Sequence, residues 1–219
     1  MIIAIDGPSA SGKSTLGRLL ARALKLLYID TGSMYRAVAL ATIEARVDPN
    51  DADAVTNLAN QIGIDLEGDP DSLCVFLDGR DVTEQIRTDK VTEMASIVSV
   101  IPGVRRAMVE RQRAMGRRGA VLNGRDIGTV VFPDADVKFF LTAAPEERAE
   151  RRFIEDQMTA SSSATLAETL ADMIERDRRD STRADSPLKI ADDAIVIDST
   201  GKSIEEVFEE MMKNVHRNH

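Results

Sequence analysis

The feature that most constrains this chain is the segment GPSASGKS, residues 7–14. It fits the pattern G-x-x-x-x-G-K-[ST] and lies between an apolar run, residues 1–6, and a helical stripe of leucines that begins at Leu16. In this context glycines let the backbone fold around an anion, while backbone amides and the helix N-terminus point at phosphate oxygens. Chance would produce the pattern in about 1% of chains of this length. The segment therefore predicts a nucleoside triphosphate site.

Each residue of this phosphate loop has an expected role. Lys13 is expected to reach the β- and γ-phosphate oxygens, and the Ser14 hydroxyl is the expected Mg²⁺ ligand. The residues expected to hold the triphosphate are Gly7, Pro8, Ser9, Ala10, Ser11, Gly12, Lys13, Ser14 and Thr15.

Three classes of protein commonly use such a loop: GTPase switches, ATPase motors and kinases of small molecules. A GTPase should carry an Asn-Lys-x-Asp guanine reader, and a motor should carry an apolar strand that ends in an acidic pair. The sequence contains neither pattern. It therefore favours a small-molecule kinase that uses a nucleoside triphosphate with Mg²⁺.

Short apolar runs alternate with helical patterns along the chain, which predicts an α/β fold. The runs show no polar alternation, as is typical of a parallel sheet covered on both faces. They span residues 1–6, 26–30, 120–123, 137–141 and 194–198. Apolar residues at helical spacing predict helices over 91–115, broken at Pro102, and over 145–158 and 163–180. A last helix should follow Ser203 and Glu206, which have the spacing of a capping box.

Two segments interrupt this alternation. Residues 65–83 contain Gly-Asp-Pro-Asp and Asp-Gly between short strand-like pieces, which is the turn chemistry of β-hairpins. We interpret them as a small β insertion. The polar stretch TASSSAT, residues 159–165, is expected to form the flexible tip of a lid between two helices.

The formal net charge of −9 argues against a general affinity for nucleic acid. No apolar run approaches the roughly 18 residues needed to span a bilayer, and the opening MIIAI is too short for a signal peptide. With its single Cys74, the chain is expected to be cytoplasmic. Its arginines gather in residues 104–118, 146–152 and 175–183. These clusters are either solvated helix faces or phosphate-binding groups that converge in space.

Two further segments follow predicted strands, where α/β proteins place ligand-binding loops. DTGSMYR occupies residues 30–36 and GRDIGTVVFPDA occupies residues 124–135. Either could be an ordinary connection between a strand and a helix. Together with ERDRRDSTR, residues 175–183, they suggest a second anion site beside the phosphate loop.

In order and spacing these segments, with IDGPSASGKST, IRT and EERAERR, make the chain resemble bacterial cytidylate kinases over nearly its whole length. The resemblance implies transfer of the γ-phosphoryl group of ATP to CMP or dCMP by a monomer. It implies a single P-loop NTPase-type kinase domain, residues 1–219, with a parallel sheet flanked by helices. It also implies a small antiparallel β insertion that binds the monophosphate, at about residues 63–88, and a helical lid at about 148–165.

The resemblance also assigns residues to the acceptor. Arginine grips phosphate with a planar fork, and Arg36, Arg125 and Arg183 match the family's phosphate-binding positions. A carboxylate accepts from the amino group of cytosine and repels the carbonyl of uracil. The residues that match positions at the base are Asp126, Thr31 and Arg105, and those that match positions around the sugar are Ser96, Arg176 and Asp180.

The reaction needs no general base, because a nucleotide phosphate with a second pKa near 6 is mostly dianionic at neutral pH. Positively charged groups would then stabilise the transferring phosphoryl group. The candidates are Lys13, Arg125, Arg148, Arg151, Arg152 and Arg178. Apart from Lys13 and Arg125, these side chains could equally form salt bridges on a helix surface.

Two positions depart from the family's pattern. Asn123 stands where aspartate is expected, so this position supplies no carboxylate to a magnesium shell, and Thr31 replaces the commoner serine. Two rival functions stay open at this point. One is a kinase of another small acceptor, such as UMP or shikimate, and the other is a regulatory module that senses or hydrolyses ATP.

Overall fold

The computed structural model describes residues 1–159 and 164–217. Its main sheet contains five parallel strands in the order β2-β6-β1-β7-β8. Their bounds are β1 Ile2–Asp6, β2 Leu27–Asp30, β6 Ala120–Gly124, β7 Val137–Thr142 and β8 Ile195–Asp198. All five predicted strands are confirmed.

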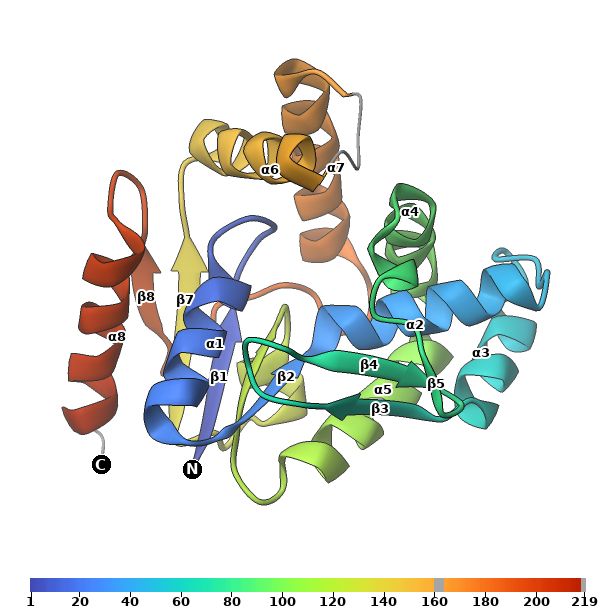
Figure 1. Ribbon diagram of the computed structural model, residues 1–219, viewed down its shortest axis with the longest axis horizontal. Coiled ribbons are helices and arrows are strands. Elements are labelled where there is room, and N and C mark those ends of the chain that lie inside the picture. The colour runs from blue at the N-terminus through green and yellow to red at the C-terminus, as the bar shows by residue number, and fades with distance from the viewer. Residues whose placement is uncertain (160–163, 218–219) are drawn as a thin grey trace.

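The sheet is covered on both faces, as its unalternating apolar strands predict (Figure 1). Ile3 and Ile5 of β1 pack with the helices α1 Lys13–Leu24 and α8 Ile204–Arg217. Ala4 between them belongs to a second cluster on the opposite face. That cluster is formed with α2 Thr31–Glu44, α3 Ala52–Gln61, α4 Asp89–Val98 and α5 Pro102–Gly116.

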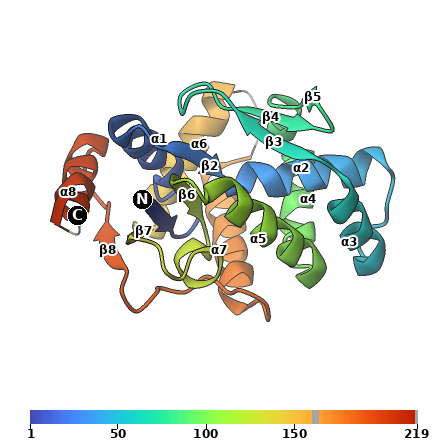
Figure 2. The same ribbon diagram turned by 90° about the horizontal axis from the view of Figure 1, so that it is seen from below.

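A small antiparallel sheet lies beside α2, as Figures 1 and 2 both show. Its strands are β3 Ile64–Glu67, β4 Cys74–Leu77 and β5 Arg80–Asp81. All three strands fall within the predicted insertion, and so does the 3-10 helix η1 Gln85–Arg87 that follows them. Helix α4 begins directly after the insertion. Ile64, Val75 and Leu77 are buried in the same core cluster as α2. The antiparallel insertion is therefore confirmed as a structural unit, while its role in binding stays a prediction.

The helices predicted from residue 91 onwards are confirmed, whereas two helices between residues 31 and 61 were not predicted. The segment 91–115 is two helices because Pro102 opens α5, and α6 Pro145–Thr159 and α7 Leu166–Thr182 form the predicted pair. The proposed lid tip lies largely outside the described residues. Helices α2 and α3 were not predicted: DTGSMYR is helical from Thr31 onwards, after Asp30 caps it by accepting a hydrogen bond from Gly32 N.

Candidate active site

The phosphate loop joins the carboxyl end of β1 to α1, the helix that begins at Lys13. Gly7 has a φ of 149°, and a Cβ at this position would lie 2.1 Å from the carbonyl oxygen of Leu141 on β7. Gly12 has a φ of 91°, in the region that favours glycine. Both glycines are thus required by the backbone path, and the loop curls over the amino end of α1.

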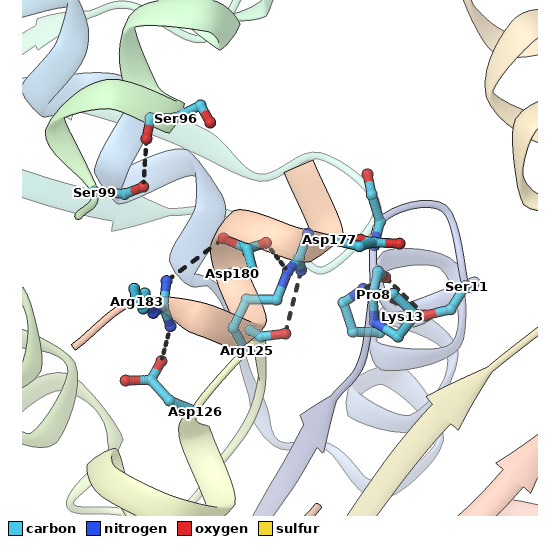
Figure 3. Close-up of polar contacts among 12 residues, drawn as sticks. Pro8, Ser11, Lys13, Ser96, Ser99, Arg125, Asp126, Asp177, Asp180 and Arg183 are labelled. Atoms are coloured by element: carbon cyan, nitrogen blue, oxygen red, sulfur yellow. Dashed lines mark hydrogen bonds and ion pairs between the residues drawn. The ribbon is translucent and has the colours of Figure 1, made fainter. Parts of the chain in front are cut away.

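Lys13 lies folded over this loop. Its Nζ donates to the carbonyl oxygen of Pro8 and to Ser11 Oγ, 3.3 Å away (Figure 3). Burial lowers the pKa of the Lys13 ammonium well below its usual value, and the charge of Arg125 lowers it further. An anionic ligand would reverse that effect by supplying negative charge beside the ammonium.

Ser14 Oγ accepts a hydrogen bond from Asn123 Nδ2 at 3.1 Å. Asn123 Oδ1 is buried and accepts no hydrogen bond from any described residue. A hydroxyl oxygen and a free amide oxygen are hard ligands of the kind Mg²⁺ prefers. In the described part of the chain, no three Asp, Glu, His or Cys side chains gather to hold a metal ion. The donor set therefore fits a magnesium ion that is also held by substrate phosphates and water, and it does not fit a metal caged by the protein alone.

Across the cleft from Lys13, arginines are paired with Asp180 of α7 and with Asp126, which lies two residues after the end of β6 (Figure 3). Arg125 Nε donates to Asp180 at 2.8 Å, and Arg183 lies 3.6 Å from Asp180 and 3.9 Å from Asp126. Burial opposes the charge of Asp180, but Arg125, Arg176 and Arg183 outweigh it and lower its pKa. Burial and the nearby Arg125 lower the pKa of Arg176 to about 10. This crowding of positive charge is chemically suited to a phosphate dianion.

The buried end of the cleft contains Asp126 and Arg105, which form a short ion pair. Arg105 is only 2% exposed, lies 5.6 Å from the ring centroid of Tyr35, and donates to the Ser99 carbonyl oxygen at 3.1 Å. Arg105 Nε and Arg183 Nη2 are buried without hydrogen-bond partners among the described residues. Donors and a carboxylate therefore line an enclosed space, where a flat polar ring could satisfy them.

Thr31 and Arg36 begin α2 beside this group. Thr31 Oγ1 donates to the Asn123 carbonyl oxygen at 2.8 Å, which ties α2 to β6. Arg36 donates to Asp30 at 3.3 Å and to Ser33 Oγ at 2.9 Å, so its guanidinium is held near the end of β2.

Asp6 links the phosphate loop to the acceptor side. Its carboxylate accepts from Ile127 N at 2.8 Å and Gly128 N at 2.7 Å, in the turn that follows Asp126. Burial is the main cause that raises the pKa of Asp6 to about 6, although both backbone hydrogen bonds lower it. This role of Asp6 was not predicted from the sequence. The available signal was a charged residue at the end of an otherwise apolar buried strand.

The arginines of α6 and α7 lie in different surroundings. Arg151 donates to Glu147 and, at 3.0 Å, to Ser199 Oγ, while Arg152 pairs with Asp156 at 2.9 Å. Arg148 is buried and donates to backbone groups and to Asp177. The side chain of Arg178 is 63% exposed and pairs with Glu175 on its own helix. This is the surface salt bridge that the sequence left open as the alternative to a catalytic role.

Most of these groups line one cleft of about 1270 Å³. It brings together most of the predicted site residues: Ser9, Ala10, Ser11, Gly12, Lys13, Ser14, Thr15, Thr31, Arg36, Arg105, Arg125, Asp126, Arg151, Arg152, Arg176, Asp180 and Arg183. Five predicted residues do not line it: Gly7, Pro8, Ser96, Arg148 and Arg178. Ser96 accepts a hydrogen bond from Ser99 Oγ through its carbonyl oxygen, one turn from the cleft.

The cleft also has walls that the sequence analysis did not identify. Cys74, Thr83 and Arg87 line it from the β insertion, and Ser199 and Lys202 line it from the turn after β8. That turn follows the carboxyl end of a parallel strand, which was the available signal. Arg87 belongs to the IRT segment that carries the family resemblance. Cys74 and Thr83 gave no signal of their own, because their proximity to the cleft depends on how the small sheet sits beside α2.

A phosphate loop and an arginine cluster that face one cleft, at the carboxyl ends of a parallel sheet, define a kinase that moves a phosphoryl group between two anionic substrates. A sequence profile of the cytidylate kinase family matches residues 3–217. The chain belongs to the cytidylate kinase family.

Individual relatives agree with this assignment. The chain is 48% identical over 216 residues to a cytidylate kinase from Geobacter sp. (strain M21), with 98% of this chain and 92% of the relative covered. It is 50% identical over 220 residues to one from Solibacter usitatus, with the same coverage. An uncharacterised protein from Eubacterium ventriosum has the same fold, with a TM-score of 0.51, 12% identity, and 99% and 98% of the two chains covered.

The protein is thus an ATP-dependent kinase of CMP and dCMP, which confirms the resemblance and excludes a mere ATP sensor. None of the helices in the described residues is both long and apolar enough to cross a membrane.

Proposed function

We propose that ATP binds at the phosphate loop, that CMP or dCMP binds at the arginine cluster, and that a phosphate oxygen of the monophosphate attacks the γ-phosphorus in line. The observation that carries this proposal is the single cleft with Lys13 on one wall and Arg125, Arg176 and Arg183 on the other. Two polyanions repel each other, so an enzyme that joins them needs cations on both sides of the reacting atoms.

The acceptor phosphate takes the place of the internal carboxylates as partner of the arginines. Arg125 and Arg183 are paired with Asp180 in this structure, and Arg36 lies beside them with its Nε buried and unpartnered among the described residues. A phosphate dianion offers more acceptor oxygens than one carboxylate and matches the planar fork of arginine. Asp180 is then free to accept from a sugar hydroxyl.

Asp126 identifies the base. Its carboxylate would accept from the exocyclic amino group of cytosine, while Arg105, held by Tyr35 and Ser99, donates to the ring nitrogen or carbonyl. Uracil presents a carbonyl where cytosine has the amino group, so its binding would leave a buried carboxylate facing an oxygen.

Mg²⁺ would be held by Ser14 Oγ together with phosphate oxygens and water, and Asn123, which donates to Ser14 Oγ, would position that hydroxyl. When bound, the ion neutralises charge on the phosphates. Arg151 and Arg152 line the same cleft and are the lid residues best placed to add positive charge near the transferring group.

Release of ADP from ATP·Mg²⁺ tests the proposal, with CMP, dCMP, UMP, AMP, GMP and shikimate offered separately beside a control without acceptor. Rapid turnover is expected with CMP and dCMP alone. Lys13→Ala should lower kcat by at least about 100-fold, because the lost cation contacts the transferring group. Turnover that is independent of the acceptor would contradict the two-site reading.

We further propose that the protein works as a monomer in the cytoplasm, where free nucleotides and ATP are available. The formal net charge of −9 disfavours a nucleic acid partner, because a long polyanion would be repelled by the acidic surface. A mononucleotide is small enough to enter the arginine-lined cleft.

A further inference from the structure

Asp177 of α7 and Arg148 of α6 together hold both backbone polar groups of one phosphate-loop residue, Ser9. Asp177 Oδ1 accepts from Ser9 N at 3.2 Å, and Arg148 Nη1 donates to the Ser9 carbonyl oxygen at 3.0 Å. The two side chains also bind each other, with Arg148 Nη1 2.6 Å from Asp177 Oδ2. Figure 3 shows Asp177 on α7 beside the phosphate loop. The lid helices are thereby joined to the loop that binds ATP.

Neither side chain lines the cleft, although Ser9 does. The side chain of Arg148 is 7% exposed, and its Nε donates to the Ala143 carbonyl oxygen at 3.1 Å, just before α6 begins. Its hydrogen bonds would have to break before the guanidinium could reach a phosphate. Arg148 and Asp177 therefore contact the loop without lining the cleft themselves.

We propose that Asp177 and Arg148 are positioning residues. They hold the backbone of the phosphate loop at Ser9 in its ATP-binding conformation before ATP binds. This proposal rests on the assignment of the loop to ATP. It replaces direct contact with the transferring phosphoryl group as the role of Arg148. A preformed loop loses less conformational freedom when the ligand binds, so the gain appears in ATP affinity.

The geometry requires both side chains. Two carboxylate oxygens let Asp177 accept from Ser9 N and from Arg148 together. The planar guanidinium lets Arg148 reach Ala143, Ser9 and Asp177 from one position, which a lysine ammonium cannot do.

Two simpler roles make different predictions for Asp177→Asn. If Asp177 is only a negative charge near Lys13 and ATP, its removal should tighten ATP binding, because the repulsion between like charges is lost. If the ion pair only joins α6 to α7, the variant should unfold at a lower temperature with unchanged affinity for both substrates. A positioning role predicts weaker ATP binding with unchanged CMP binding.

The test is calorimetric titration of Asp177→Asn and Arg148→Lys with ATP·Mg²⁺ alone and with CMP alone. Asp172→Asn is the matched control, since Asp172 is an exposed residue of α7 and loses the same charge. We expect the Kd for ATP to rise about tenfold in both test variants, as for the loss of one charge-assisted hydrogen bond, and the Kd for CMP to change less than twofold.

The amide signal of Ser9 in a ¹⁵N-labelled sample is a second readout, and it should shift in Asp177→Asn without ligand. Tighter or unchanged ATP binding, or an equal loss for ATP and CMP, would overturn the proposal. Arg148→Lys keeps the charge and provides the answer if Asp177→Asn does not fold. Failure of the wild-type protein to turn over CMP would instead contradict the proposed function, so the two failures are distinguishable.

Discussion

Asp126 is nearly enclosed, and one of its oxygens is held by the equally buried Arg105. Asp126→Asn keeps the shape but turns one acceptor into a donor. We expect the preference for CMP over UMP, measured as a ratio of kcat/KM values, to fall about 10- to 100-fold, the discrimination of one good hydrogen-bonding pair. Asp134→Asn, at an exposed position a few residues further on, should leave the ratio unchanged. An unchanged ratio in Asp126→Asn would eliminate its role in recognising the base.

Asp6 makes a prediction about pH. Because burial raises its folded pKa to about 6, from 3.8, Asp6 stabilises the folded state below pH 4, and this contribution is lost as the pH rises through 6. Asp6→Asn removes the titration. Between pH 4 and 6 the free energy of unfolding should therefore move in favour of the variant, by something on the order of 3 kcal/mol. Chemical denaturation at several pH values measures the difference, and parallel profiles would contradict the shift.

At the scale of elements, α7 and α8 both begin with a capping box but pack against different parts of the molecule. Ser203 and Glu206 form a capping box at α8, and Thr165 and Glu168 form one at α7. Ser203→Ala should cost about 1 kcal/mol of global stability, because α8 buries Val207, Met211 and Val215 in the core. Thr165→Ala should instead increase hydrogen exchange within α7 with little change in the global unfolding temperature. Equal effects on global stability would show that α7 unfolds with the core.

The sequence predicted the elements whose signals are local. The five strands, the break at Pro102 and the Ser203 box all depend on residues adjacent in the chain, and each is confirmed. Helix α2 was not predicted because nine of its residues are buried. Its sequence therefore shows no amphipathic stripe of apolar residues on one face. The contact of Asp177 with Ser9 spans 168 positions. No local pattern could reveal it.

For the molecule as a whole, acidic charge and arginine-lined cleft act in opposite directions. The net charge of −9 repels a long polyanion, whereas the arginines of the cleft attract a mononucleotide that can enter it. Binding to duplex DNA should therefore be negligible in a gel-shift assay at physiological salt, while CMP added at 100 times its Kd should stabilise the protein by about 2.7 kcal/mol. A retarded DNA band would contradict the charge argument.

The pairing of acceptor arginines with carboxylates of the chain itself affects how the enzyme empties as well as how it fills. When a charged product leaves, Asp180 and Asp126 are already within 4 Å of the guanidinium groups and can take over as their counter-ions. One anion can then replace another at Arg125 and Arg183, and neither guanidinium is left without a nearby carboxylate. Under the proposed function, departure of the diphosphate should therefore cost less than in a cleft lined by arginines alone, which would make tight recognition compatible with rapid turnover.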